Sequence, residues 1–93
     1  MANTVWKYQL TKEDQVISLP VGAVVLSVAV QNGTTCMWVK LDPEEPKVSR
    51  RFVELGTGGV FPEDIIHNSE YFIGTCRHGQ IVTHVFEVYD KVK

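Results

Sequence analysis

The sequence predicts an all-β fold, a single small antiparallel β-sandwich or partly open barrel of about seven strands. Two observations predict this class. Apolar and polar residues alternate with a period of two along most of the chain, whereas the helical period is nearly absent. Turn-forming residues also recur at short intervals, as in small antiparallel proteins. The 93 residues are expected to form one domain, 1–93, with a single core.

The first two strands are expected near the N-terminus. Trp6, Tyr8 and Leu10 alternate with polar residues, as in a half-buried strand. A polar turn over 11–14 leads to a short strand over 16–19. The proline that follows ends this strand, because proline cannot donate to a ladder.

A central hairpin over 23–41 is the clearest element. Asn32-Gly33 between two apolar runs is the strongest short signal for a two-residue turn, and it sets Ser27 opposite Trp38. One face of this hairpin then reads as a core face, and it carries Val24, Leu26, Val28 and Val30 against Thr35, Met37, Val39 and Leu41.

The opposite face of the hairpin is partly apolar and centres on Trp38. Small Ser27 and Ala29 leave room for the indole to lie across the strands. Either the loop over 42–48 covers the indole, or the face meets another subunit or a flat ligand. We expect a homo-oligomer with an interface formed by Trp38, Ser27, Ala29 and Lys40.

The second half of the chain shows three further elements. A strand over 51–55 follows an acidic, proline-containing loop over 42–47. Residues 62–67 begin with a proline and acidic residues, which is typical of one helical turn. Segments 71–77 and 80–89 are expected to form a hairpin around His78-Gly79, with His84 among apolar neighbours as a core histidine.

The segment around the two arginines is the best candidate for binding an anion. A glycine-rich turn presents backbone N–H groups to a phosphate, and arginine adds a bidentate donor. Arg50 and Arg51 point to opposite faces of a strand, where Glu54 is placed to neutralise Arg50. The alternative is a flexible turn with two solvated arginines, because no P-loop sequence follows. The ligand is expected to be nucleotide-like, at a site formed by Arg50, Arg51, Gly56, Thr57, Gly58, Gly59 and His84.

Other kinds of site and partner find no support in the sequence. The histidines and cysteines lack metal-ligand spacing, so no metal or cofactor is expected, and no catalytic motif is present. The net charge of −2 and the absence of a basic stripe argue against duplex nucleic acid. No stretch matches a membrane span or signal peptide. Cys36 and Cys76 are expected to be free thiols, although a disulfide stays open.

Several short motifs together resemble a family of small uncharacterised phage and prophage proteins. They are VWKY at 5–8, VQNGT at 30–34 followed by MW, RRF at 50–52, GTGG at 56–59, YFIGT at 71–75 and HVFE at 84–87. The resemblance implies a viral accessory or virion protein in the cytoplasm of a host bacterium. We expect a non-catalytic binding protein that counters bacterial defence, by sequestering a nucleotide signal or occluding a host protein. A virion or assembly component and a small hydrolase are the alternatives.

Overall fold

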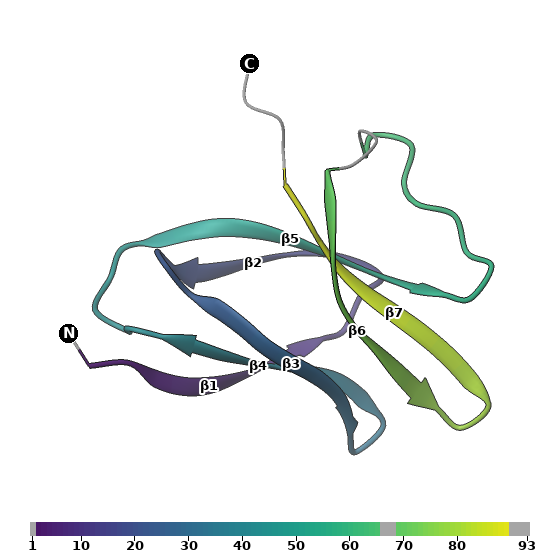
Figure 1. Ribbon diagram of the computed structural model, residues 1–93, viewed down its shortest axis with the longest axis horizontal. Coiled ribbons are helices and arrows are strands. Elements are labelled where there is room, and N and C mark those ends of the chain that lie inside the picture. The colour runs from purple at the N-terminus through teal and green to yellow at the C-terminus, as the bar shows by residue number, and fades with distance from the viewer. Residues whose placement is uncertain (1, 66–68, 90–93) are drawn as a thin grey trace.

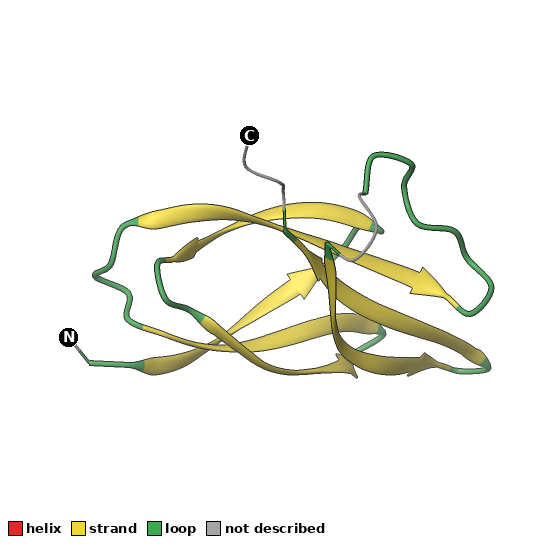
Figure 2. Ribbon diagram, turned by 45° about the horizontal axis from the view of Figure 1, so that its top comes forward, coloured by secondary structure: helices red, strands yellow, loops and turns green. Residues whose placement is uncertain are grey.

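The computed structural model describes residues 2–65 and 69–89 and shows seven strands in two sheets (Figure 1). The strands are β1 (Thr4–Leu10), β2 (Asp14–Pro20), β3 (Val24–Gln31), β4 (Thr34–Leu41), β5 (Lys47–Gly56), β6 (Glu70–His78) and β7 (Ile81–Val88). The predicted all-β fold is confirmed. Within the described ranges there is no helix, and the two sheets form a sandwich and not a closed barrel (Figure 2).

The chain passes repeatedly between the two sheets. The three-stranded sheet has the order β1-β4-β3, and the four-stranded sheet has the order β2-β5-β7-β6. All ladders are antiparallel. The consecutive strands β1 and β2 lie in different sheets, as do β4 and β5, so short connections tie the layers together. The edge strands β3 and β6 lie side by side along one side of the sandwich (Figures 1 and 2).

The central hairpin turns at the predicted residues. Asn32 and Gly33 have φ angles of 54° and 78°, the left-handed values that a two-residue type I′ turn requires. The predicted register is observed from the turn as far as Ser27 opposite Trp38. The pair Asn-Gly therefore determined both the turn and the pairing next to it.

A bulge at Leu26 changes the register of the hairpin beyond this point. Val25 and not Leu26 lies opposite Val39. The prediction that Val24 and Leu26 face the core is therefore wrong, and both side chains are 52% exposed. The physical reason is that one extra residue in a strand reverses the alternation of faces that follows it.

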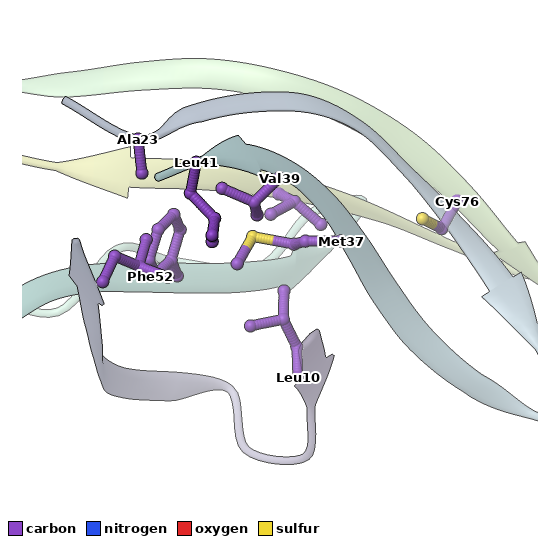
Figure 3. Packing of buried hydrophobic residues seen from close by; sticks show 9 residues of the cluster. Leu10, Ala23, Met37, Val39, Leu41, Phe52 and Cys76 are labelled. Atoms are coloured by element: carbon purple, nitrogen blue, oxygen red, sulfur yellow. The ribbon is translucent and has the colours of Figure 1, made fainter. Parts of the chain in front are cut away.

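The core lies between the sheets, and the inward face of β4 forms its centre (Figure 3). Met37, Val39 and Leu41 are buried as predicted. They belong to one buried cluster with Leu19 of β2 and Phe52 of β5. Full burial of such a side chain stabilises a fold by about 1.5–3 kcal/mol, so this cluster is the main source of stability.

The edge strands of the two sheets are in tight contact where Val28 of β3 meets Gly74 of β6. A Cβ atom on Gly74 would lie 2.7 Å from Cγ2 of Val28, which is closer than real Cβ atoms come. Glycine is therefore needed for the edge strands to approach here. The ladder between β6 and β7 shifts register between Phe72 and Gly74, so the contact coincides with a bulge.

The second hairpin turns one residue later than predicted. Its turn residues are Gly79 and Gln80, and His78 lies within the strand opposite Ile81. Gly79 has a φ of 62°, a left-handed conformation that costs glycine less than any other residue. The turn is therefore built on this glycine and not on the histidine before it.

His84 is not a core residue, and the prediction that placed it in the core is wrong. The buried inward residue of this part of β7 is its neighbour Val85, so His84 lies on the outer face. That face is partly apolar because the loop after β5 packs on it. The centroids of the Phe61 and Phe86 rings lie 4.9 Å apart. When both faces of a strand are covered, the sequence does not distinguish them.

The helical turn predicted over 62–67 is a simple hydrogen-bonded turn where it is described. The N–H of Ile65 donates to the carbonyl of Pro62 at 3.1 Å. Residues 66 and 67 of the predicted range lie outside the described residues.

Substitution of Gly74 tests the contact between the edge strands. Gly74→Ala should lower the free energy of unfolding by about 1–3 kcal/mol, because the added methyl group overpacks against Val28. The loss should be smaller in a Val28→Ala background, as a urea-denaturation double-mutant cycle would measure. Gly56→Ala is the control, because its Cβ would meet its nearest atom at an ordinary 3.8 Å. Equal losses at the two glycines would contradict the close approach.

Candidate functional site

Four segments meet at one end of the sandwich and line an open pocket of about 480 Å³, which we call the loop-end pocket. They are the β1–β2 turn, the β3–β4 turn, the end of β5 and the β6–β7 hairpin. Each segment adds polar groups to the lining. Those used below are Lys12, Glu13, Thr35, Glu54, His78 and Thr83.

The central group of this pocket is the carboxylate of Glu54. Glu54 follows the buried Phe52 by two residues on β5, so its side chain points inward and is only 13% exposed. Its Oε2 accepts hydrogen bonds from Oγ1 of Thr35 at 2.6 Å and from Oγ1 of Thr83 at 2.7 Å. Such bonds are needed to hold a carboxylate where little water reaches it.

His78 extends this hydrogen-bonded cluster. Its Nε2 lies 2.8 Å from Oγ1 of Thr35 and 3.5 Å from Oε2 of Glu54. Because the single hydroxyl hydrogen of Thr35 is donated to Glu54, Nε2 carries the proton in the bond from His78 to Thr35. The arrangement is a chain of donors that ends on the carboxylate. It suits recognition of a hydroxyl or amine group that adds one more donor to Glu54.

Both cysteines are free and buried, which confirms the expectation of free thiols. Burial raises the pKa of Cys76, and the negative charge of Glu54 raises it further. The thiol is therefore protonated at neutral pH and is a poor nucleophile. Over residues 2–65 and 69–89, no group of three or more histidine, cysteine or acidic side chains is placed to hold a metal ion.

Arg50 lies away from the loop-end pocket and forms a buried ion pair. Its Nε and Nη2 donate to the two carboxylate oxygens of Glu87 at 2.6 and 2.8 Å, and its Nη1 donates to the carbonyl of Ala23 at 2.7 Å. The expectation that Glu54 neutralises Arg50 is wrong. Glu54 lies four residues along the same extended strand, whereas Glu87 comes from the adjacent strand β7.

Arg51 points to the opposite face from Arg50, as predicted, and is paired there with two carboxylates. Its Nε and Nη2 donate to Asp14 at 2.8 and 2.7 Å, and its Nη1 and Nη2 donate to Asp64 at 2.8 and 3.1 Å. These bonds use four of the five guanidinium donors. The positive charge predicted to bind an anion is thus already balanced within the fold.

The glycine-rich turn begins at the end of β5, whereas the arginines lie in the middle of this extended strand and are paired with carboxylates there, so the structure does not bring these two parts of the predicted site together. Gly56 lines the loop-end pocket. The N–H of Gly59 donates to the carbonyl of Gly56 at 2.8 Å, so this donor closes the turn. Gly58 has a φ of 90°, which explains a glycine at that position.

Two other predicted binding residues do meet beside this turn. Oγ1 of Thr57 lies 2.8 Å from Nε2 of His84, and Oγ1 of Thr75 lies 3.1 Å from its Nδ1. Both ring nitrogens of His84 therefore have hydroxyl partners. A binding role for this pair stays a prediction.

The predicted interface residues share the outer face of the three-stranded sheet. The half-buried Trp38 lies in β4 opposite Lys7 of β1 and Ser27 of β3. Ala29 and Lys40 are exposed on the same face. We call this surface the Trp38 face.

Sequence reasoning missed the centre of the loop-end pocket. A usable signal existed for Glu54, because a carboxylate that shares the inward alternation of Phe52 has to be buried with polar partners. No comparable signal joined Thr35 to His78, since they belong to different hairpins in different sheets.

Comparison with known proteins places the chain in a family without assigning it a function. A family model described as a domain of unknown function (DUF7352) matches residues 1–93. The chain belongs to this family. No curated protein and no solved structure matches it. The DUF7352 match does not bear on a phage origin, which stays a prediction. In the described part of this DUF7352 chain, no helix is long and apolar enough to cross a membrane.

The ion pairs of Arg51 predict a specific dependence of stability on pH. Hydrogen bonds from Arg51 hold the pKa values of Asp14 and Asp64 below their ordinary value of 3.8. Their stabilising effect is therefore present above about pH 4–5 and is lost as the pH falls through the lowered values. Wild type should unfold at higher urea than Arg51→Gln near pH 7, and the difference should shrink below about pH 4.

The matched control for this measurement is Arg77→Gln. Arg77 is exposed on β6, and the structure of the described residues shows no ion pair for it. Its loss should change stability little at either pH. A difference in stability between wild type and Arg51→Gln that does not vary with pH would contradict the ion pairs of Arg51 with Asp14 and Asp64.

Proposed function

We propose that this protein is a non-catalytic binding protein whose loop-end pocket takes a nucleotide-like ligand. The observation that carries the proposal is the hydrogen-bonded carboxylate of Glu54 in an open pocket that four separate segments line. Its volume of about 480 Å³ falls within the range of small-molecule sites, about 300–1,000 Å³.

The lining of the pocket suits a ligand that has hydroxyl groups and one negative charge. Glu54 accepts hydroxyl donors, as acidic residues accept ribose hydroxyls in dinucleotide sites. Lys12 offers an ammonium group for a phosphate oxygen, and the ring of His78 offers a surface for a base. The carboxylate of Glu13, next to Lys12 in the sequence, repels a ligand that carries a high negative charge. A phosphodiester, which carries a single charge, therefore fits better than a polyphosphate.

Binding fits the Glu54 cluster better than acid–base catalysis. A general acid or base has to come within hydrogen-bond distance of the reacting atoms of its substrate. Here Oε2 of Glu54 and Nε2 of His78 lie 3.5 Å apart, and the hydroxyl of Thr35 contacts both. The two groups face each other and not a substrate, which weighs against the small-hydrolase alternative.

A protein that holds a nucleotide without converting it acts by sequestration. With the resemblance to phage and prophage proteins, this supports a role against bacterial defence in the host cytoplasm. Occlusion of a host protein and assembly into virions are the competing roles. Recovery of the protein from purified virions would favour assembly into virions. Improved phage plating on defended bacteria that express the protein would favour a role against bacterial defence.

A panel of nucleotides tests the binding proposal. Cyclic dinucleotides, cyclic mononucleotides, mononucleotides and nucleosides are added to the full chain, and the melting temperature is measured. A ligand present at a hundredfold its Kd stabilises the fold by about 2.7 kcal/mol, which raises Tm by more than about 10 °C in a domain of this size. No shift with any member of the panel would contradict the proposal.

Variants of the lining show whether a shift arises in this pocket. Glu54→Gln should weaken the binding of nucleotides and nucleosides alike, whereas Lys12→Ala should weaken the binding only of compounds that carry phosphate. Lys47→Ala removes the same charge at the opposite end of β5 and should change neither. A shift that survives both pocket variants would place the ligand elsewhere, with Thr57 and His84 as the next candidates.

We also propose that the Trp38 face binds a second copy of the chain. Two exposed valines, Val5 and Val24, lie on this face on either side of Lys40, two residues along β4 from Trp38. Exposed apolar side chains near an aromatic residue are characteristic of contact surfaces. Lys7 and Lys40 add positive charge, so association should strengthen when salt screens their repulsion.

Sedimentation of two matched variants tests self-association. Ala29→Arg adds bulk and positive charge to the Trp38 face and should weaken association at least tenfold. Ser18→Arg places the same side chain at an exposed strand position in the other sheet and should leave association unchanged. Analytical ultracentrifugation at high micromolar concentration, in low and high salt, gives the result. A wild-type monomer under both conditions would overturn the proposal.

A further inference from the structure

A second pocket, of about 380 Å³, opens between the edge strands β3 and β6, and we call it the seam pocket. It lies beside Val24 and Leu26 on β3 and beside Tyr71 and Phe72 on β6. Both strands have a register shift here, after Val25 on β3 and after Phe72 on β6. Bulges bend the strands that contain them and are frequent next to functional sites.

The walls of the seam pocket are aromatic and unusually exposed. Tyr71 and Tyr89 are 61% and 51% exposed. The rings of Tyr71 and Tyr89 lie with centroids 6.5 Å apart. Large rings exposed in this number on one hollow of a small protein indicate a contact surface.

A charged pair lies at the base of these rings. Glu87 and Arg50 both line the pocket, and the side chain of Glu87 is only 4% exposed. Arg50 binds both oxygens of this carboxylate. Arg50 uses three of its five donors, two on Glu87 and one on the carbonyl of Ala23, and Glu87 accepts from Arg50 and Tyr89. A carboxylate has about four acceptor positions, so two donors and one acceptor position remain for a further molecule.

We propose that the seam pocket binds a neutral carbohydrate. A sugar ring has C–H faces that pack against aromatic side chains and adjacent hydroxyl groups that both donate and accept. Those hydroxyl groups match the carboxylate of Glu87 and the guanidinium of Arg50, which lie side by side. The apolar faces match Tyr71 and Tyr89. This site is separate from the loop-end pocket and is carried by different residues.

The ion pair favours an uncharged ligand, because the charges of Arg50 and Glu87 already neutralise each other. An anion would meet Glu87 as well as Arg50, and a cation would meet Arg50 as well as Glu87, so one member of the pair repels either kind of ligand. A neutral ligand keeps the pair intact and adds hydrogen bonds to it.

Titration of the full chain with sugars tests the proposal. The panel contains glucose, galactose, mannose, N-acetylglucosamine and their disaccharides at millimolar concentration, with glucuronate, glucosamine and uridine as comparisons. Saturation-transfer NMR should show contact through the ring C–H groups of a neutral sugar, and calorimetry should give its affinity. Tyr71→Ala and Tyr89→Ala should each weaken that affinity about tenfold, as truncation of a central aromatic contact does.

Two control variants assign the result to this pocket. Val16→Ala, at an exposed position of β2, should leave sugar binding unchanged. Lys12→Ala should also leave it unchanged, so that failure of the seam pocket and failure of the loop-end pocket are distinguishable. The proposal is overturned if no neutral sugar binds, if both aromatic variants bind as wild type does, or if a charged sugar or uridine binds more tightly than every neutral sugar.

Discussion

The contact between Val28 and Gly74 determines how closely the edge strands of the two sheets approach each other. It joins edge strands of different sheets, and the absence of a side chain on Gly74 allows it. On one side of the contact the strands continue to their hairpin turns and help to line the loop-end pocket. On the other side, the bulged parts of both strands open the seam pocket. Both candidate sites therefore depend on one steric constraint in the middle of two strands.

The two inward-facing glutamates show how burial of similar groups produces different sites. Glu87 is matched by the guanidinium of Arg50, so the base of the seam pocket is electrically neutral. Glu54 is held by the hydroxyl groups of Thr35 and Thr83, so this carboxylate keeps its negative charge and accepts hydroxyl donors, while Lys12 supplies positive charge to the loop-end pocket. The partner of each carboxylate thus determines what the carboxylate still offers to a ligand.

Prediction from sequence succeeded where the signal was local and failed where it depended on a neighbouring strand. The Asn32-Gly33 turn and the buried face of β4 followed from turn chemistry and alternation. The exposure of Leu26 did not, because a bulge has no reliable pattern in a single sequence. The partner predicted for Arg50 was wrong for a related reason. Glu54 was its neighbour in sequence, whereas strand pairing brought Glu87 next to it.

The sequence by itself determined the fold class, the first hairpin and the opposite orientation of Arg50 and Arg51, because a period of two and a two-residue turn are properties of adjacent residues. Only the tertiary structure decided that Arg51 is neutralised, that His84 faces outward, and that Thr35, Glu54 and His78 form one cluster. These results depend on which strands lie next to each other and which loop covers which face. Such contacts join residues far apart in the chain, and no local pattern records them.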